Sequence, residues 1–73
     1  TLDPEKPDVY LTIGDALANL GQLEPALQAY EQALQIDPAQ IDATISLGMV
    51  HAQLGHWEQA EAAFENAHQL DPD

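Results

Sequence analysis

The sequence repeats itself at an interval of 34 residues. The segment ALQAYEQALQIDP, at residues 26–38, returns as AEAAFENAHQLDP at residues 60–72. Its ending also occurs as LDP at residues 2–4, so this short motif appears three times at the same interval. A chain that repeats on this scale folds as successive copies of one structural unit, each of which buries its apolar face against a neighbour.

Within each copy, apolar residues recur at steps of three and four, which is the period of an α-helix. A glycine interrupts each copy, at Gly21 and Gly55, and Asp37-Pro38 ends the first copy, because a residue before proline is driven out of the α region. No segment shows the strict alternation of a β-strand. The sequence therefore predicts an all-α fold with antiparallel helices near residues 8–20, 24–36, 42–54 and 58–70.

Small and aromatic residues occupy equivalent positions in the two copies. The matched pairs are Gly14 and Gly48, Gly21 and Gly55, Ala26 and Ala60, Tyr30 and Phe64, Ala33 and Ala67, and Pro38 and Pro72. The second copy departs from the first at two positions, with Thr44 in place of Tyr10 and His51 in place of Leu17. This pattern resembles the tetratricopeptide repeat (TPR), a helix–turn–helix unit of 34 residues.

The resemblance implies an α-solenoid with one TPR-like repeat at residues 7–40 and another at residues 41–73. Residues 1–6 would then be the tail of a preceding repeat. We expect Gly14 and Gly48 to let the two helices of a repeat approach closely, with Tyr30 and Phe64 filling the space beside them. Because such arrays usually need about three repeats and a polar cap, the chain is expected to be a fragment of a longer array.

The charge balance limits the possible partners. Lys6 is the only Lys or Arg, against thirteen Asp and Glu, and the formal net charge is −12. Nucleic acids and anionic membranes are bound mainly through Lys and Arg, so neither is expected as a partner. No apolar run is long enough to span a bilayer. We expect a soluble chain, with a cytoplasmic location favoured, whose partner is a protein or peptide, possibly a basic one.

Candidates for chemistry are few. The chain has no cysteine, and His51 and His56 are five residues apart rather than at the i,i+4 spacing of a helical zinc pair. Ser46 and His51 have no acid partner or glycine-rich loop beside them that would suggest nucleophilic catalysis. We therefore expect no metal, no cofactor and no enzymatic activity, and interpret His51 as a half-buried packing residue.

The resemblance implies protein–protein interaction, with the first helix of each repeat lining a concave groove that binds a peptide. The groove residues implied for this chain are Asp8, Leu11, Thr12, Asp15, Ala18, Asn19, Asp42, Ile45, Ser46, Met49, Ala52 and Gln53. Leu11, Ile45 and Met49 lie outside the core stripe that we predict for Tyr10, Ile13, Leu17 and Leu20. Exposed apolar residues of this kind favour an acidic groove with an apolar centre. The alternative is that they pack against a neighbouring repeat.

A second hypothesis is a structural module that assembles with itself. Two repeats without a cap leave apolar faces at both ends, so that residues 58–70 of one chain would cover residues 10–20 of another. Such end-to-end contacts are heterologous and can extend into filaments.

Overall fold

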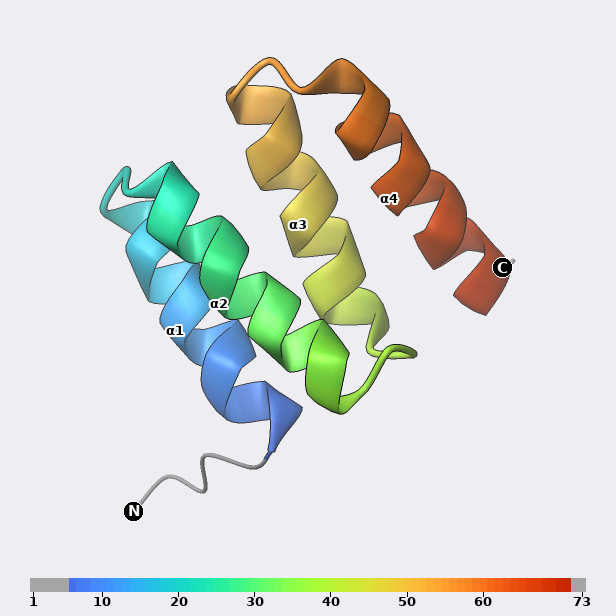
Figure 1. Cartoon of the computed structure of the whole chain (residues 1–73), viewed down its shortest axis with the longest axis horizontal. Coiled ribbons are helices and arrows are strands. Elements are labelled where there is room, and N and C mark those ends of the chain that lie inside the picture. The colour runs from blue at the N-terminus through green and yellow to red at the C-terminus, as the bar shows by residue number, and fades with distance from the viewer. Residues whose placement is uncertain (1–5, 72–73) are drawn as a thin grey trace.

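The computed structural model describes residues 6–71, which form four helices joined by short turns (Figure 1). The helices are α1 (Pro7–Asn19), α2 (Leu23–Ile36), α3 (Ile41–Gln53) and α4 (Trp57–Leu70). The described residues contain no strand, and each helix begins and ends within about one residue of its predicted limit. The prediction of an all-α, four-helix fold is confirmed. The LDP motifs at residues 2–4 and 70–72 lie wholly or partly outside the described residues.

The helices pack as two antiparallel hairpins that stand side by side. Contacts join α1 to α2 and α3 to α4 within the hairpins, and α3 packs between them against α2 and, less extensively, α1 (Figure 1). None of these helices combines the length and apolar character that crossing a membrane requires. The arrangement places the first helices of both hairpins, α1 and α3, next to each other.

Glycine makes the turn within each hairpin. The φ angles of Gly21 and Gly55 are +79° and +81°, in the left-handed region that side chains disfavour. The turns also share their hydrogen bonds, since the N–H of Gln22 donates to the carbonyl of Leu17 and that of His56 donates to His51. This is the pattern of a helix that ends at a left-handed glycine, and it confirms the predicted turns.

The core lies between the two hairpins. Ala26, Leu27 and Tyr30 of α2 form a buried cluster with Val50 of α3. Leucines from α1, α2 and α3 pack around this cluster. Because Val50 belongs to the second hairpin, the first hairpin completes its core only when the second one covers it.

The predicted close approach within each hairpin is present. A Cβ atom added to Gly14 would lie 2.6 Å from Cε1 of Tyr30, and one added to Gly48 would lie 2.9 Å from Cε1 of Phe64. Both distances are shorter than a van der Waals contact, so each glycine is required by the aromatic ring that lies against it. Tyr30 is 2% exposed, whereas Phe64 is 42% exposed.

The predicted core stripe was wrong at three positions. Ile13 and Leu20, which we expected in the core, are 40% and 72% exposed. Their equivalents in α3, Leu47 and Leu54, pack against the core because α2 lies beside α3, and no described helix lies at that side of α1. Leu11, which we expected outside the core, packs against the central cluster. For Leu11, the alternative of packing between repeats is therefore correct.

Candidate functional site

A hollow of about 290 Å³ lies between α1 and α3. Its lining residues are Asp15, Ala18 and Asn19 of α1, Tyr30 of α2, and Ser46, Met49, Val50 and Gln53 of α3. We call it the α1–α3 hollow. The structure thus brings together half of the residues that the resemblance implied for the groove.

The floor of the α1–α3 hollow is formed by a buried tyrosine. The hydroxyl group of Tyr30 donates a hydrogen bond of 2.6 Å to Oδ1 of Asp15. Burial raises the pKa of Tyr30 to about 12, and the nearby Asp15 carboxylate acts in the same direction, because both disfavour a phenolate. Tyr30 is therefore a protonated donor at neutral pH, and it holds the Asp15 carboxylate in place at the hollow.

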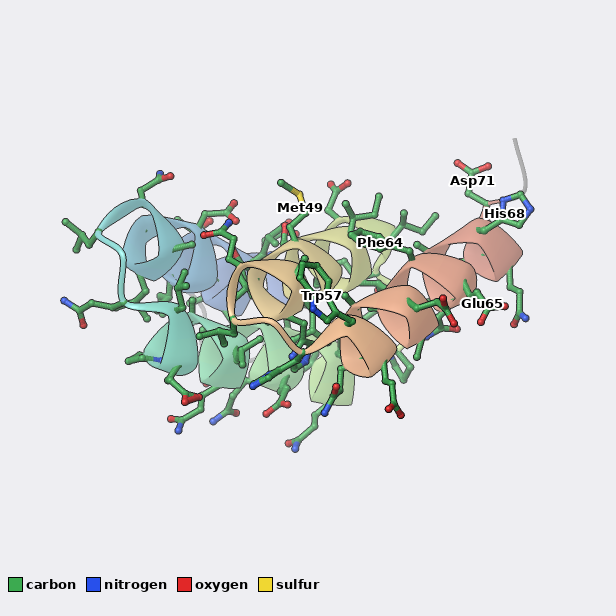
Figure 2. All side chains as sticks on the ribbon, turned by 90° about the horizontal axis from the view of Figure 1, so that it is seen from above. Met49, Trp57, Phe64, Glu65, His68 and Asp71 are labelled. Atoms are coloured by element: carbon green, nitrogen blue, oxygen red, sulfur yellow. The ribbon has the colours of Figure 1, made fainter. Side chains whose placement is uncertain are left out.

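The apolar part of the α1–α3 hollow is contributed by Met49 and Val50. Met49 is 52% exposed and projects outward from α3 on the side opposite α2 (Figure 2). Its unbranched thioether side chain adapts to differently shaped apolar partners. Since Asn19 and Gln53 add amide groups, the hollow offers an adaptable apolar contact together with donors, acceptors and one carboxylate.

The other predicted groove residues lie elsewhere. Oδ1 of Asp8 accepts a hydrogen bond of 2.9 Å from Nε2 of Gln40, just before α3. Thr12 and Asp42 are exposed without lining the α1–α3 hollow. Ile45, which is 38% exposed, lines a separate hollow of about 400 Å³ with Phe64 of α4. Leu11 is in the core, as described above, and Ala52 lines a third hollow, on α4.

The two histidines at the second turn form a pair. The Nδ1 atoms of His51 and His56 lie 3.1 Å apart, so that one ring donates and the other accepts. Burial lowers the pKa of His51, the charge of His56 lowers it further, and Glu31 acts in the opposite direction. No group of three or more His, Asp or Glu side chains among residues 6–71 is arranged to hold a metal ion.

Sequence reasoning did not place Tyr30 or Val50 at the site, because both were assigned to packing. One signal was present for Tyr30. Its equivalent in the second repeat is Phe64, so a hydroxyl group is present in only one of two otherwise matching positions. A buried hydroxyl needs a hydrogen-bond partner, and here that partner is Asp15.

The comparisons with known proteins agree with this architecture. A family model described as TPR repeat matches residues 14–55, and one described as Tetratricopeptide repeat matches residues 42–73. No protein of a curated set matches the chain. Among solved structures, MamA AMB-1 is similar with a TM-score of 0.89 and 29% identity, over 94% of this chain. The chain spans 41% of the length of that MamA chain.

The repeats that these family models describe generally mediate protein–protein interactions, and domains built from them are typically non-enzymatic scaffolds. The matched segments together run from Gly14 to Asp73 and include both hairpins almost completely. The chain therefore belongs to the tetratricopeptide repeat family.

Proposed function

We propose that the chain is a binding scaffold that holds a short segment of another protein in the α1–α3 hollow. The observation that carries the proposal is the exposed Met49 side chain beside the Asp15 carboxylate, in a hollow that both repeats form together. An apolar contact flanked by a few convergent polar groups is the usual composition of a binding site. Asp8, Thr12 and Asp42 extend the same acidic surface beyond the hollow.

The composition of the hollow indicates which segment would fit. An apolar side chain of the partner would contact Met49, and a Lys, an Arg or a backbone N–H would donate to Asp15. The amides of Asn19 and Gln53 can bind the backbone of an extended segment. A net charge of −12 favours a basic segment and speeds its encounter at low ionic strength. A free C-terminal carboxylate is disfavoured because it would meet Asp15.

The test is a titration of isotope-labelled protein with short peptides that carry one Leu flanked by Lys residues. Chemical-shift changes should centre on Asp15, Asn19 and Met49. The variant Met49→Glu should lose binding while its helix content stays unchanged. The control is Gln35→Glu, which adds the same charge at an exposed position of α2 and should bind as the parent does.

Two results would contradict the proposal. Unaltered peptide binding by Met49→Glu would show that the peptide lies elsewhere. Unfolding of Met49→Glu would show that Met49 is needed for the core rather than for a partner.

End-to-end self-assembly is the second candidate function. It is favoured by the exposed Ile13 and Leu20 of α1 at one end and the exposed Trp57 and Phe64 of α4 at the other. The like charges of two chains, each with a net charge of −12, oppose it. Sedimentation across a range of protein concentrations tests it, since assembly raises the apparent mass with concentration and, through screening, with salt.

A further inference from the structure

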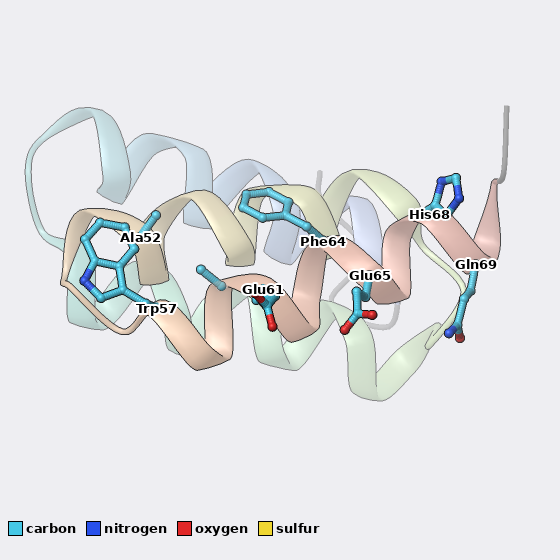
Figure 3. A pocket seen from close by; sticks show the side chains of 8 residues that line it. Ala52, Trp57, Glu61, Phe64, Glu65, His68 and Gln69 are labelled. Carbon is cyan, nitrogen blue, oxygen red and sulfur yellow. The ribbon is translucent and has the colours of Figure 1, made fainter.

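A larger hollow, of about 620 Å³, follows the outer side of α4 (Figure 3). The residues that define it are Ala52, Trp57, Ala60, Glu61, Phe64 and Glu65. We call this surface the α4 face. Trp57 is 69% exposed here and Phe64 is 42% exposed, so the α4 face presents two aromatic rings to solvent. It is separate from the α1–α3 hollow, with which it shares no lining residue.

The internal repeat shows what kind of element fits the α4 face. A shift of 34 residues places Ala60 on Ala26 and Phe64 on Tyr30. In the first hairpin, these two equivalents are buried in one cluster with Val50 of α3. The same surface of the first hairpin is thus covered by a helix. The α4 face has the matching small and aromatic residues, and it is open among the described residues.

One difference between the two faces decides which helix fits. Glu61 of the α4 face stands at the position of Leu27, which is buried in the cluster with Val50. Glu65 stands at the position of Glu31, whose charge reaches His51 of α3 and raises its pKa. A helix with apolar residues at both of these points would bury the Glu61 carboxylate without a counter-charge, which is strongly unfavourable.

We propose that the α4 face binds an amphipathic helix of another protein, with apolar side chains on Trp57 and Phe64 and with basic side chains opposite Glu61 and Glu65. In Figure 3, Glu61 and Glu65 follow each other along α4, with Phe64 on the side toward α3. The apolar and acidic parts of the face thus lie next to each other, as an amphipathic basic helix requires.

A second copy of this chain is a poorer occupant. End-to-end stacking would place α1 on the α4 face, with Ile13 and Leu20 as its exposed apolar residues. The helix α1 contains no Lys or Arg, and Lys6 is the only basic residue of the whole sequence besides histidine. A second copy therefore cannot supply basic side chains to both Glu61 and Glu65.

The test uses the full chain and the fluorescence of Trp57, which is the only tryptophan of the sequence. The probe is a capped peptide with the sequence of residues 41–54 in which Val50 and His51 are replaced by Arg, because these α3 positions face Leu27 and Glu31. Binding should move the Trp57 emission to shorter wavelength and saturate. The unsubstituted peptide should bind about tenfold more weakly, as expected for two surface ion pairs.

Matched variants separate charge at the α4 face from charge in general. The double variant Glu61→Gln with Glu65→Gln should weaken binding of the Arg peptide about tenfold and reduce its dependence on salt. The control is Glu24→Gln with Glu58→Gln, which removes the same charge from the first turns of α2 and α4 and should bind as the parent does. Met49→Glu should leave the Trp57 signal unchanged, which distinguishes this surface from the α1–α3 hollow.

Three results would overturn the proposal. Trp57 emission might stay constant with the Arg peptide, or the two peptides might bind equally well, and in either case the basic helix is not the occupant. A shift of Trp57 emission with rising protein concentration and apparent mass, in the absence of peptide, would assign the α4 face to a second copy of the chain.

Discussion

The hydroxyl group of Tyr30 donates a hydrogen bond of 2.6 Å to Oδ1 of Asp15 and so joins α2 to α1 beneath the α1–α3 hollow. The same ring lies against Gly14, where an added Cβ would be 2.6 Å from Cε1. Tyr30 is thus fixed at its edge by packing and at its hydroxyl by Asp15. Both contacts have measurable consequences.

The Tyr30 hydroxyl predicts a loss of stability at alkaline pH. Its pKa rises from 10.0 to about 12 on folding, so the folded state binds this proton more tightly than the unfolded state. The stabilisation is fully present below about pH 10 and is lost as the pH rises toward 12, at up to about 1.4 kcal/mol per pH unit. Urea denaturation of a Tyr10→Phe variant at several alkaline pH values measures this slope, with Tyr30 then the only tyrosine.

Tyr30→Phe is the control for this prediction. It keeps the ring but lacks the titrating group, so its free energy of unfolding should depend less on pH in the same range. Equal slopes for the two proteins would contradict the role assigned to the Tyr30 hydroxyl.

The two helix-crossing glycines should respond differently to alanine. Gly14→Ala should destabilise the chain by about 1–3 kcal/mol, because the ring of Tyr30 is buried and cannot move away from the new methyl group. Gly48→Ala should change stability by less than about 1 kcal/mol, because the exposed Phe64 ring can move and alanine favours the helix. Denaturant melts of both variants compare them directly. A larger loss in Gly48→Ala would mean that Phe64 is held as rigidly as Tyr30.

The turn glycines should be needed for their backbone conformation alone. An added Cβ at Gly21 or Gly55 would meet no atom within 4 Å, yet both residues have positive φ. Gly21→Ala should therefore cost about 1–2 kcal/mol, and Gly21→Asn should cost less, since asparagine tolerates the left-handed region better. Thermal denaturation of the two variants provides the measurement. If alanine and asparagine cost the same, a cause other than the backbone angle is responsible.

The histidine pair predicts sensitivity to mild acid. The folded state lowers the pKa of His51, so the unfolded state binds more protons as the pH falls below the ordinary histidine value of about 6.5. The free energy of unfolding should fall over this range, and the stabilisation is fully present above it. His51→Leu, which restores the residue found at Leu17, should flatten the dependence. His68→Gln, at an exposed position, should leave it unchanged.

Much of the fold could be predicted from local sequence. The steps of three and four between apolar residues, the glycines at residues 21 and 55, and Asp37-Pro38 determine four helices and two turns, because each acts through the backbone within a few residues. The 34-residue offset adds the pairing of Gly14 with Tyr30, since the repeat unit itself contains that contact. The same offset brought half of the implied groove residues into one hollow.

Burial, by contrast, was decided only by the tertiary structure. The two repeats have nearly the same apolar pattern, yet Tyr30 is 2% exposed and Phe64 is 42% exposed. Likewise, Leu47 packs against the core while its equivalent Ile13 is exposed, and Leu11 is packed while Ile45 lines an open hollow. The sequence by itself determines which residues can be buried in a repeat. Which of them are buried depends on whether a neighbouring helix covers that face, because apolar surface leaves water only through contact with another surface.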